Sequence, residues 1–262
     1  MAVNLTGRLA LVTGSTSGIG LGIAKCLAKV GADVVIHGFG DAKTIEDICS
    51  DISSTFKVKA HFLPADISKK AEIEEMMRRV GELGGADIVL VCIGIQHVSP
   101  ISEFEDNMWD KIIAVNLTSA FHTTKLSLPL MRSKNWGRVI NVASVHGLVA
   151  SADKSAYVVA KHGLVGLTKV TALENARSGI TCNAVCPGWV LTPLVKQQIE
   201  ARAEKEGTDF EAAKRDLLQE KQPSCDFVTE EQLGGLVTFL CSTAADEVRG
   251  VAWAMDGGWT AQ

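Results

Sequence analysis

Short apolar runs and longer amphipathic segments alternate along the chain of 262 residues. The runs are nearly continuous and rich in β-branched side chains, whereas the segments between them carry apolar residues at helical spacing, as at Ile45, Ile48 and Ile52. Strands without polar alternation, separated by helices, predict a parallel sheet that is covered on both faces. The six runs that we expect to form strands are residues 9–13, 33–37, 58–63, 87–91, 138–142 and 180–185.

This pattern predicts an α/β fold in which one doubly wound (Rossmann) domain spans residues 1–262. We expect a parallel sheet of about seven strands with helices on both faces. One core of this size is possible because single domains reach ~250–300 residues, and no internal repeat or low-complexity linker divides the chain. Such sheets bind ligands beyond the carboxyl ends of their strands, so the functional residues are expected there.

The segment at about residues 193–222 departs from this rhythm. Between residues 196 and 221, 13 of 26 residues are charged. Two interpretations remain open. The segment is either a helical pair with solvated faces or a small helical lid over the substrate, since segments at the carboxyl edge of a sheet often close on a ligand.

Charge and cysteine content exclude several classes of protein. The 26 lysine and arginine residues against 30 aspartate and glutamate residues give a net charge of −4 with both signs interspersed, so nucleic acid is not expected as a partner. The seven cysteines lack CxxC pairs and flanking histidines, which indicates free thiols in a reducing compartment and no metal site. The sequence contains no stretch of ~18 uninterrupted apolar residues, so no membrane span is expected. The first apolar run is not preceded by a cleavable leader pattern, and we therefore expect a cytoplasmic protein.

A glycine-rich turn, TGSTSGIG at residues 13–20, lies between the first apolar run and the first expected helix. Glycines allow a tight turn and a close approach to a pyrophosphate, and the start of the helix offers free N–H groups to the phosphates. The turn alone is weak evidence, but its place between strand and helix predicts a dinucleotide site. The residues expected to contact the cofactor here are Gly14, Thr16, Ser17, Gly18, Ile19 and Gly20.

The end of the second run bears on the choice of cofactor. A dinucleotide fold usually carries an acid at this point to bind the adenosine ribose, whereas this chain has Gly38. No Arg or Lys lies in residues 15–17 or 37–40 to meet a 2′-phosphate, which favours NAD over NADP. Phe39 is either an adenine contact or an ordinary loop aromatic. Asp66, followed by Ile67, is placed after the third run to accept from the adenine amino group.

Residues 151–163 read SADKSAYVVAKHG and contain Tyr157, the only tyrosine of the chain. On a helix, Tyr157 and Lys161 share one face. A free phenol has a pKa near ~10, and a cation within ~4–6 Å lowers it toward the range in which a general base works. The alternative is a half-buried tyrosine beside a lysine. Ser144, after the fifth run, can bind the substrate oxygen, and Asn116 can anchor a water or a backbone bend beside the lysine.

With these motifs the chain resembles the short-chain dehydrogenase/reductase family over essentially its whole length. The resemblance rests on TGSTSGIG, Ser144, the YVVAK run and a turn at Cys186-Pro-Gly188. It implies hydride transfer between NAD(P) and an alcohol or ketone, and a homotetramer. The implied catalytic tetrad is Asn116, Ser144, Tyr157 and Lys161. The implied cofactor contacts beyond the glycine turn are Gly94, Tyr157, Lys161, Pro187, Gly188, Val190 and Thr192. Of these, Thr192 would hold the carboxamide.

One motif departs from the family. Members usually have Asn-Asn-Ala-Gly after the fourth strand, where this chain reads Val91-Cys92-Ile93-Gly94. The missing amides predict altered backbone hydrogen bonding and weaker cofactor binding, and Ile93 is expected to crowd the adenosine side. None of the four implied catalytic positions is changed.

Further segments are similar to the members of the family that oxidise D-3-hydroxybutyrate to acetoacetate with NAD. A short carboxylate substrate needs cationic and amide donors, and Gln96, His146, Lys154 and Gln198 supply them. Trp189 and Trp259 are expected to wall the methyl group. Two alternatives remain: a family member that reduces a bulkier ketone, and a non-catalytic NAD-binding protein.

Overall fold

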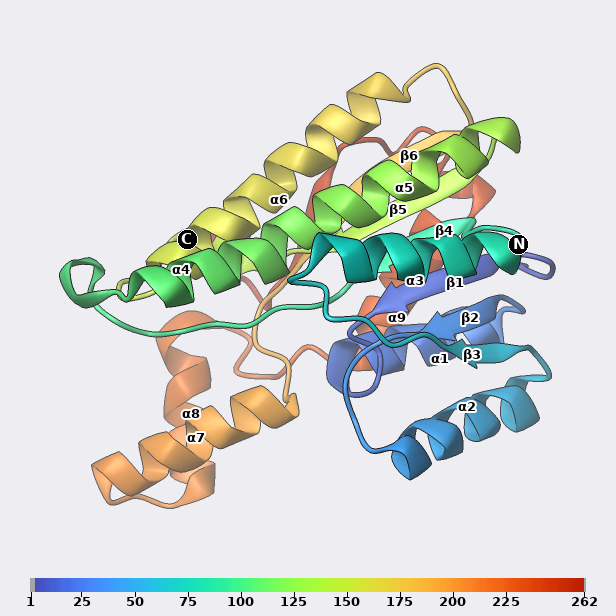
Figure 1. Cartoon of the computed structure of the whole chain (residues 1–262). Coiled ribbons are helices and arrows are strands. Elements are labelled where there is room, and N and C mark those ends of the chain that lie inside the picture. The colour runs from blue at the N-terminus through green and yellow to red at the C-terminus, as the bar shows by residue number, and fades with distance from the viewer. Residues whose placement is uncertain (1–2, 262) are drawn as a thin grey trace.

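The apolar runs of the sequence form one seven-stranded parallel sheet (Figure 1). The computed structural model describes residues 3–261, and its strands pair in the order β3-β2-β1-β4-β5-β6-β7. The strand order therefore reverses between β1 and β4, as in a doubly wound fold. The strands are β1 (Leu9–Thr13), β2 (Asp33–Ile36), β3 (Ala60–Phe62), β4 (Ile88–Val91), β5 (Gly137–Val142), β6 (Ile180–Pro187) and β7 (Ala252–Met255).

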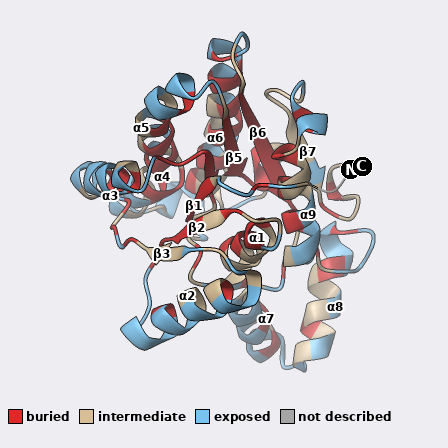
Figure 2. Ribbon diagram, turned by 90° about the vertical axis from the view of Figure 1, so that its right-hand side faces the viewer, coloured by how far each residue is buried: buried red, intermediate tan, exposed pale blue. Residues whose placement is uncertain are grey.

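Helices cover both faces of the sheet, which confirms the predicted fold class. α3, α5 and α6, with α4 beside them, lie on one face, and α1, α2 and α9 lie on the other (Figures 1 and 2). The helices are α1 (Gly18–Lys29), α2 (Ala42–Phe56), α3 (Lys70–Glu82), α4 (Asp106–Ile113), α5 (Ser119–Ser133), α6 (Ser155–Glu174), α7 (Pro193–Glu206), α8 (Phe210–Lys221) and α9 (Glu230–Leu240).

Burial on both faces explains why the strands lack polar alternation. Every residue of β1, β4, β5 and β6 is buried. Leu11 packs into the apolar cluster on the α3, α5 and α6 face, whereas its neighbours Ala10 and Val12 pack into the cluster on the α1 and α9 face. Neighbouring residues of a strand point to opposite faces, so both must be apolar here.

The carboxyl end of β6 corrects one prediction. Cys186 and Pro187 were expected in a turn, but both continue the strand, and Pro187 pairs with Met255 of β7. Proline lacks an N–H group, but the N–H of Gly188 donates to the carbonyl of Met255 at 2.9 Å and continues the ladder. The prediction of a turn is therefore wrong by two residues, and the chain leaves the sheet only after Pro187.

α7 and α8 lie outside the layers that cover the sheet (Figures 1 and 2). They pack on each other through a small apolar cluster around Val195, Ile199 and Ala213, while their charged residues are mostly exposed. A helical pair with solvated faces is thus what the structure contains. Closure of this pair over a ligand stays a prediction.

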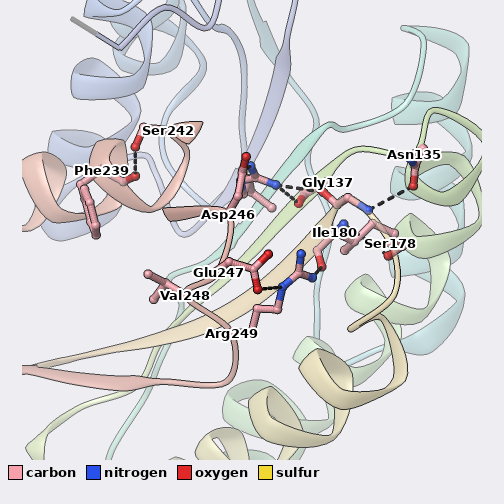
Figure 3. Close-up of polar contacts among 12 residues, drawn as sticks. Asn135, Gly137, Ser178, Ile180, Phe239, Ser242, Asp246, Glu247, Val248 and Arg249 are labelled. Carbon is pink, nitrogen blue, oxygen red and sulfur yellow. Dashed lines mark hydrogen bonds and ion pairs between the residues drawn. The ribbon is translucent and has the colours of Figure 1, made fainter. Parts of the chain in front are cut away.

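The amino ends of the strands carry a network of charged groups. Arg138, only 1% exposed, bonds the carbonyls of Gly137 and Gly179 and pairs with Asp246. Arg249 lies between Glu247 and the carbonyl of Ile180, to which it donates at 2.8 Å (Figure 3).

A second ion-pair group stands beside this network, at the amino end of β4. The buried carboxylate of Asp87 accepts from Arg8 at 3.2 Å, from Lys134 at 3.1 Å and from the backbone N–H of Leu9 at 3.0 Å. Each buried charge at this edge thus has a partner.

Among the helices of residues 3–261, none has the length and apolar character needed to cross a bilayer.

Candidate active site

A cavity of about 480 Å³ opens at the carboxyl ends of the strands, between the glycine turn, the ends of β4, β5 and β6, and α7. Most residues predicted for cofactor and substrate lie in its wall. They are Gly14, Thr16, Ser17, Gly18, Ile19, Gly20, Phe39, Gly94, Gln96, Ser144, His146, Lys154, Tyr157, Lys161, Pro187, Gly188, Trp189, Val190, Thr192, Gln198 and Trp259.

The glycine turn has the shape of a phosphate cradle. Gly14 and Gly18 have positive φ angles of 66° and 52°, and a Cβ on Gly20 would lie 2.2 Å from the carbonyl oxygen of Gly14, so a side chain is excluded there. Ser17 precedes α1 and makes no capping hydrogen bond with its side chain. The first N–H groups of α1 and the Ser17 hydroxyl are therefore available to an anion, which fits a dinucleotide pyrophosphate.

The structure explains the glycine at the end of β2. Gly38 has a φ of 154°, and a Cβ there would lie 2.7 Å from the hydroxyl oxygen of Thr16. An acid at this position would displace the turn, since Thr16 donates to the carbonyl of Phe39 at 2.9 Å. The buried His37 ties the turn in place, because its Nδ1 accepts from the Gly14 N–H and its Nε2 donates to the carbonyl of Ala65. Phe39 is 70% exposed at the rim of the cavity.

Asp66 and Ile67 are not part of the cavity wall. The carboxylate of Asp66 accepts from the N–H and hydroxyl of Ser68 and pairs with Lys69 at 3.3 Å, and the Ile67 side chain is buried. The contact between Asp66 and adenine stays a prediction.

Asn116 also lies outside the cavity wall, and its side chain binds the backbone of the loop that follows β4. It belongs to a π-helical turn, Ala114–Thr118, between α4 and α5. Its amide accepts from the N–H of Ile95 at 2.9 Å and donates to the carbonyl of Ile95 at 2.8 Å. Asn116 was expected to anchor a water or a backbone bend, and the structure contains the anchored bend. π-helical turns such as this one are frequent at functional sites.

The unusual Cys92 does not leave the backbone unpaired. Its N–H donates to the hydroxyl of Thr13 at 3.1 Å, so the β1 threonine provides a polar partner at this point. The expected disturbance of hydrogen bonding is therefore absent at Cys92. Burial raises the pKa of the Cys92 thiol to about 12, and both Cys92 and Ile93 line the cavity.

α6 places Tyr157 and Lys161 on one side, toward the cavity, as their spacing predicts. The Lys161 ammonium donates to the carbonyl of Val142 at 2.9 Å and lies 5.7 Å from the centre of the Tyr157 ring. Burial lowers the pKa of Lys161 to about 8.

The pKa of Tyr157 differs from the expectation. Burial raises it, and the nearby Ser144 hydroxyl opposes part of this rise. Loss of water on burial is the largest cause of the rise, and the Lys161 ammonium is directed to the Val142 carbonyl. Tyr157 on its own is therefore a protonated phenol.

Ser144 and His146 follow β5 and form one short turn. The Ser144 hydroxyl oxygen accepts from the His146 N–H at 3.2 Å, and His146 Nε2 lies 2.9 Å from the Ser151 hydroxyl. The His146 ring lies edge-on to Tyr157, with ring centres 5.8 Å apart. The pKa of His146 is lowered to about 4 by burial and, to a smaller extent, by the charge of Lys154. The imidazole is thus neutral at pH 7.

Two tryptophans close the far side of this pocket. The ring centres of Trp189 and Trp259 are 5.7 Å apart, and Trp259 lies 5.5 Å from His146. The Lys154 ammonium lies 5.5 Å from the Trp189 ring, and burial lowers its pKa. The Trp189 indole N–H is buried without a partner among the described residues.

The electrostatic character of the pocket follows from these groups. No Asp or Glu is found among the described residues that line the cavity, whereas Lys154, Gln96 and Gln198 provide hydrogen-bond donors. Such a pocket suits a small anion placed beside Tyr157. The combination of a dinucleotide cradle, a Tyr-Lys pair and this anion pocket is that of a short-chain dehydrogenase/reductase.

Comparison with known proteins agrees with this class. A family model described as enoyl-(acyl carrier protein) reductase matches residues 14–260, and the chain belongs to the short-chain dehydrogenase/reductase family of oxidoreductases. Its relatives include a protein of Cupriavidus necator named D-beta-hydroxybutyrate dehydrogenase, which is 61% identical over 259 residues, covering 98% of this chain and 100% of the relative. A protein of Rhizobium meliloti with the same name is 48% identical over 256 residues, covering 97% and 99%.

The fold also matches a solved structure. L-sorbose reductase from Gluconobacter frateurii, complexed with NADPH and L-sorbose, superposes with a TM-score of 0.95 at 27% identity, covering 100% of both chains. The two proteins thus share the doubly wound domain along their full length.

Proposed function

We propose that this oxidoreductase interconverts D-3-hydroxybutyrate and acetoacetate with NAD. The observation that carries the proposal is the acid-free pocket beside Tyr157, in which Lys154, Gln96 and Gln198 offer donors to a carboxylate. The pocket holds these donors next to the tyrosine, so a substrate with a hydroxyl two carbons from its carboxylate fits both groups. The names of the two bacterial relatives support the same substrate.

The glycine turn would hold the cofactor by its pyrophosphate. A bound NAD would supply the acceptor for the hydride that leaves the carbon carrying the hydroxyl. Glycine at position 38 and the lack of Arg or Lys in residues 15–17 and 37–40 leave no group to bind a 2′-phosphate, which supports NAD as the cofactor.

Tyr157 acts as the general base in this proposal. Its phenolate removes the hydroxyl proton, and Ser144 orients the substrate oxygen. Burial alone raises the pKa of Tyr157, so the base needs positive charge nearby, and Lys161 together with the oxidised cofactor provides it. The proton leaves through Lys161 toward the bend that Asn116 anchors.

Recognition of the substrate uses the other end of the pocket. Lys154, Gln96, His146 and Gln198 bind the carboxylate, and Trp189 and Trp259 enclose the methyl group. His146 is neutral at pH 7 and contributes a hydrogen bond without adding charge. In this proposal residues 1–262 belong to one Rossmann domain. The segment 193–222 closes as a lid when substrate binds, because Gln198 lies on it.

We also propose that the protein works as a homotetramer in the cytoplasm. Support for assembly comes from the apolar side chains of Phe121, Val170 and Leu173, which α5 and α6 leave exposed. Light scattering coupled to size exclusion tests the oligomeric state, and a monomer mass would contradict this part of the proposal.

The central test follows NADH absorbance with each enantiomer of 3-hydroxybutyrate and with NAD or NADP. We expect NADH from the D enantiomer with NAD, and little product with NADP. Absence of turnover with D-3-hydroxybutyrate would refute the proposed substrate. Oxidation of NADPH by an acetoacetyl thioester would instead support a reductase of bulkier ketones, and inactivity toward both would leave a non-catalytic NAD-binding protein.

A further inference from the structure

Gln222 is a fully buried polar residue that has no part in the mechanism. It follows α8, and 0% of its surface is exposed. Its Oε1 accepts from the backbone N–H of Trp189 at 2.8 Å, and its Nε2 donates to the carbonyl of Asp226. The amide thus uses both its acceptor and its donor, which is the condition for burying such a group at low cost.

Two glycines pack closely against the Gln222 side chain. A Cβ on Gly188 would lie 2.4 Å from the Gln222 Oε1, and a Cβ on Gly257 would lie 2.7 Å from the Gln222 Cγ. Gly257 also has a φ of 58°, which favours glycine. The side chain is therefore wedged between the end of β6 and the turn that precedes Trp259.

The hydrogen bonds around Gln222 fix the backbone of Trp189 from both sides. The Trp189 N–H donates to Gln222, and its carbonyl accepts from the Val228 N–H at 2.9 Å. The Ser224 N–H in turn donates to the carbonyl of Gly257 at 3.0 Å. Residues 189 and 222–228 are the two ends of the α7–α8 segment, so the amide joins both ends to the C-terminal turn.

The two residues that this arrangement places are the tryptophans of the substrate pocket. Trp189 and Trp259 pack with ring centres 5.7 Å apart, and both line the cavity. A shift of either end of the α7–α8 segment would change the distance between them. The space beside the substrate methyl group depends on that distance.

We propose that Gln222 is a positioning residue for substrate specificity: it holds Trp189 against Trp259 and thereby limits the length of the hydroxy acid that the pocket accepts. The inference rests on the proposed function for the identity of the substrate. Gln222 touches neither the substrate nor the cofactor in this view and acts only through the two tryptophans.

The first test replaces the amide by an apolar side chain of similar length. Gln222→Met is compared with Gln219→Met, which changes an exposed glutamine in the last turn of α8. For Gln222→Met we expect the KM for D-3-hydroxybutyrate to rise by about tenfold, since the buried Trp189 N–H loses its acceptor, with kcat within about twofold of the unchanged protein. The ratio of kcat/KM for 3-hydroxyvalerate over 3-hydroxybutyrate should rise.

The second test uses Gln222→Glu and the pH. A protonated carboxyl has one acceptor and one donor, like the amide, whereas a carboxylate only accepts. The KM of Gln222→Glu divided by that of the unchanged protein should therefore rise with pH and approach one in acid. Lys221, Cys225 and Asp226 are ionisable residues close to Gln222 along the chain, and Asp256 lies across the turn. Because both proteins contain them, the ratio removes their contribution.

A raised KM with a shifted chain-length ratio supports the inference, whereas unchanged kinetics of Gln222→Met overturn it. A fall of kcat for both substrates in step with the folded fraction, measured by thermal unfolding, overturns it as well. If Gln222→Met does not fold, the pH series of Gln222→Glu is the remaining test. A KM ratio of Gln222→Glu to the unchanged protein that does not vary with pH would refute the positioning role of Gln222. Failure of the unchanged protein to oxidise D-3-hydroxybutyrate refutes the proposed function instead.

Discussion

Buried charged residues have different surroundings at the two ends of the strands. At the amino ends of the strands, Arg138 and Asp87 are buried and each has charged and backbone partners. At the carboxyl ends, Lys161 and His146 are buried, and neither they nor Lys154 form an ion pair within the described part of the chain. Burial lowers the pKa of all three, so their charged forms are disfavoured.

This difference distinguishes charged residues that stabilise the fold from ionisable residues that can take part in proton transfer or substrate binding. A buried charge with partners recovers part of the desolvation penalty, although burial still lowers the pKa of Arg138, and removal of one partner is costly. A buried ionisable group without a counter-charge lowers the stability of the protein, but it can exchange a proton near neutral pH. Substitutions of charged residues at the amino ends of the strands should therefore lower the free energy of unfolding and leave turnover unchanged. Substitutions at the carboxyl ends should lower turnover without lowering the free energy of unfolding.

Tyr157→Phe should give the largest effect on activity. It removes the hydroxyl that takes the proton, and loss of general-base catalysis typically lowers kcat by about 10²–10⁴-fold. NADH formation from D-3-hydroxybutyrate measures the loss, and calorimetric NAD binding together with the melting temperature serves as the control. Full activity of this variant would overturn the mechanism. Lys161→Ala should likewise lower kcat for every substrate.

Asp87→Asn should show the opposite behaviour at the amino edge. Its carboxylate is 4% exposed and pairs with Arg8 and Lys134, so we expect the free energy of unfolding to fall by about 3 kcal/mol. The kcat should stay unchanged. Asp51→Asn is the matched control, because Asp51 pairs with Lys25 at the surface and its loss should cost less than about 1 kcal/mol. Equal losses in urea unfolding would contradict the contrast between buried and exposed pairs.

Lys154→Ala should affect one class of substrate. It removes the cation that faces the carboxylate, and loss of a charged hydrogen bond should raise the KM for D-3-hydroxybutyrate by about 10–100-fold. A neutral secondary alcohol of similar size should be oxidised as before. Lys169→Ala changes an exposed lysine of the same helix and serves as the control. An unchanged KM for the hydroxy acid would argue against the proposed carboxylate site.

His146 should make the protein sensitive to acid, with the smallest effect of the four. Its pKa is lowered to about 4 in the folded protein, below the ordinary value of 6.5, so folding favours the neutral ring. Its contribution to stability is complete above about pH 6.5 and is lost as the pH falls toward 4, a loss on the order of 1–2 kcal/mol between pH 7 and pH 5. His146→Gln should lose correspondingly less stability over this interval. A His146→Gln variant that loses as much stability as the unchanged protein between pH 7 and pH 5 would contradict this role of His146.

The architecture follows from sequence because the strands are buried on both faces. Five of the six apolar runs coincide with strands to within one residue at their start, and the run at residues 58–63 contains the shorter β3. β7 was not among those runs, because its sequence Ala-Trp-Ala-Met lacks β-branched residues and is only partly buried. The end of β6 was also missed, since Pro187 resembles a turn residue until its pairing with β7 is known.

The site was predictable where one helix or one turn places the residues. Tyr157 and Lys161 meet because they are four residues apart on α6, and the glycine turn follows from its place between β1 and α1. The pKa of Tyr157 was not predictable, since it depends on how much water the folded chain removes. Gln222 was missed as well, because its two partners lie 33 and four residues away and no local pattern marks them.

Tyr157 is the only tyrosine of the chain. If every tyrosine is labelled with carbon-13 at the ζ position, the spectrum therefore contains one signal, and it belongs to the proposed general base. Its chemical shift reports whether the phenol is ionised, without assignment experiments or background from other tyrosines. The proton that the reaction depends on can thus be followed directly by nuclear magnetic resonance, first in the free protein and then as NAD is added.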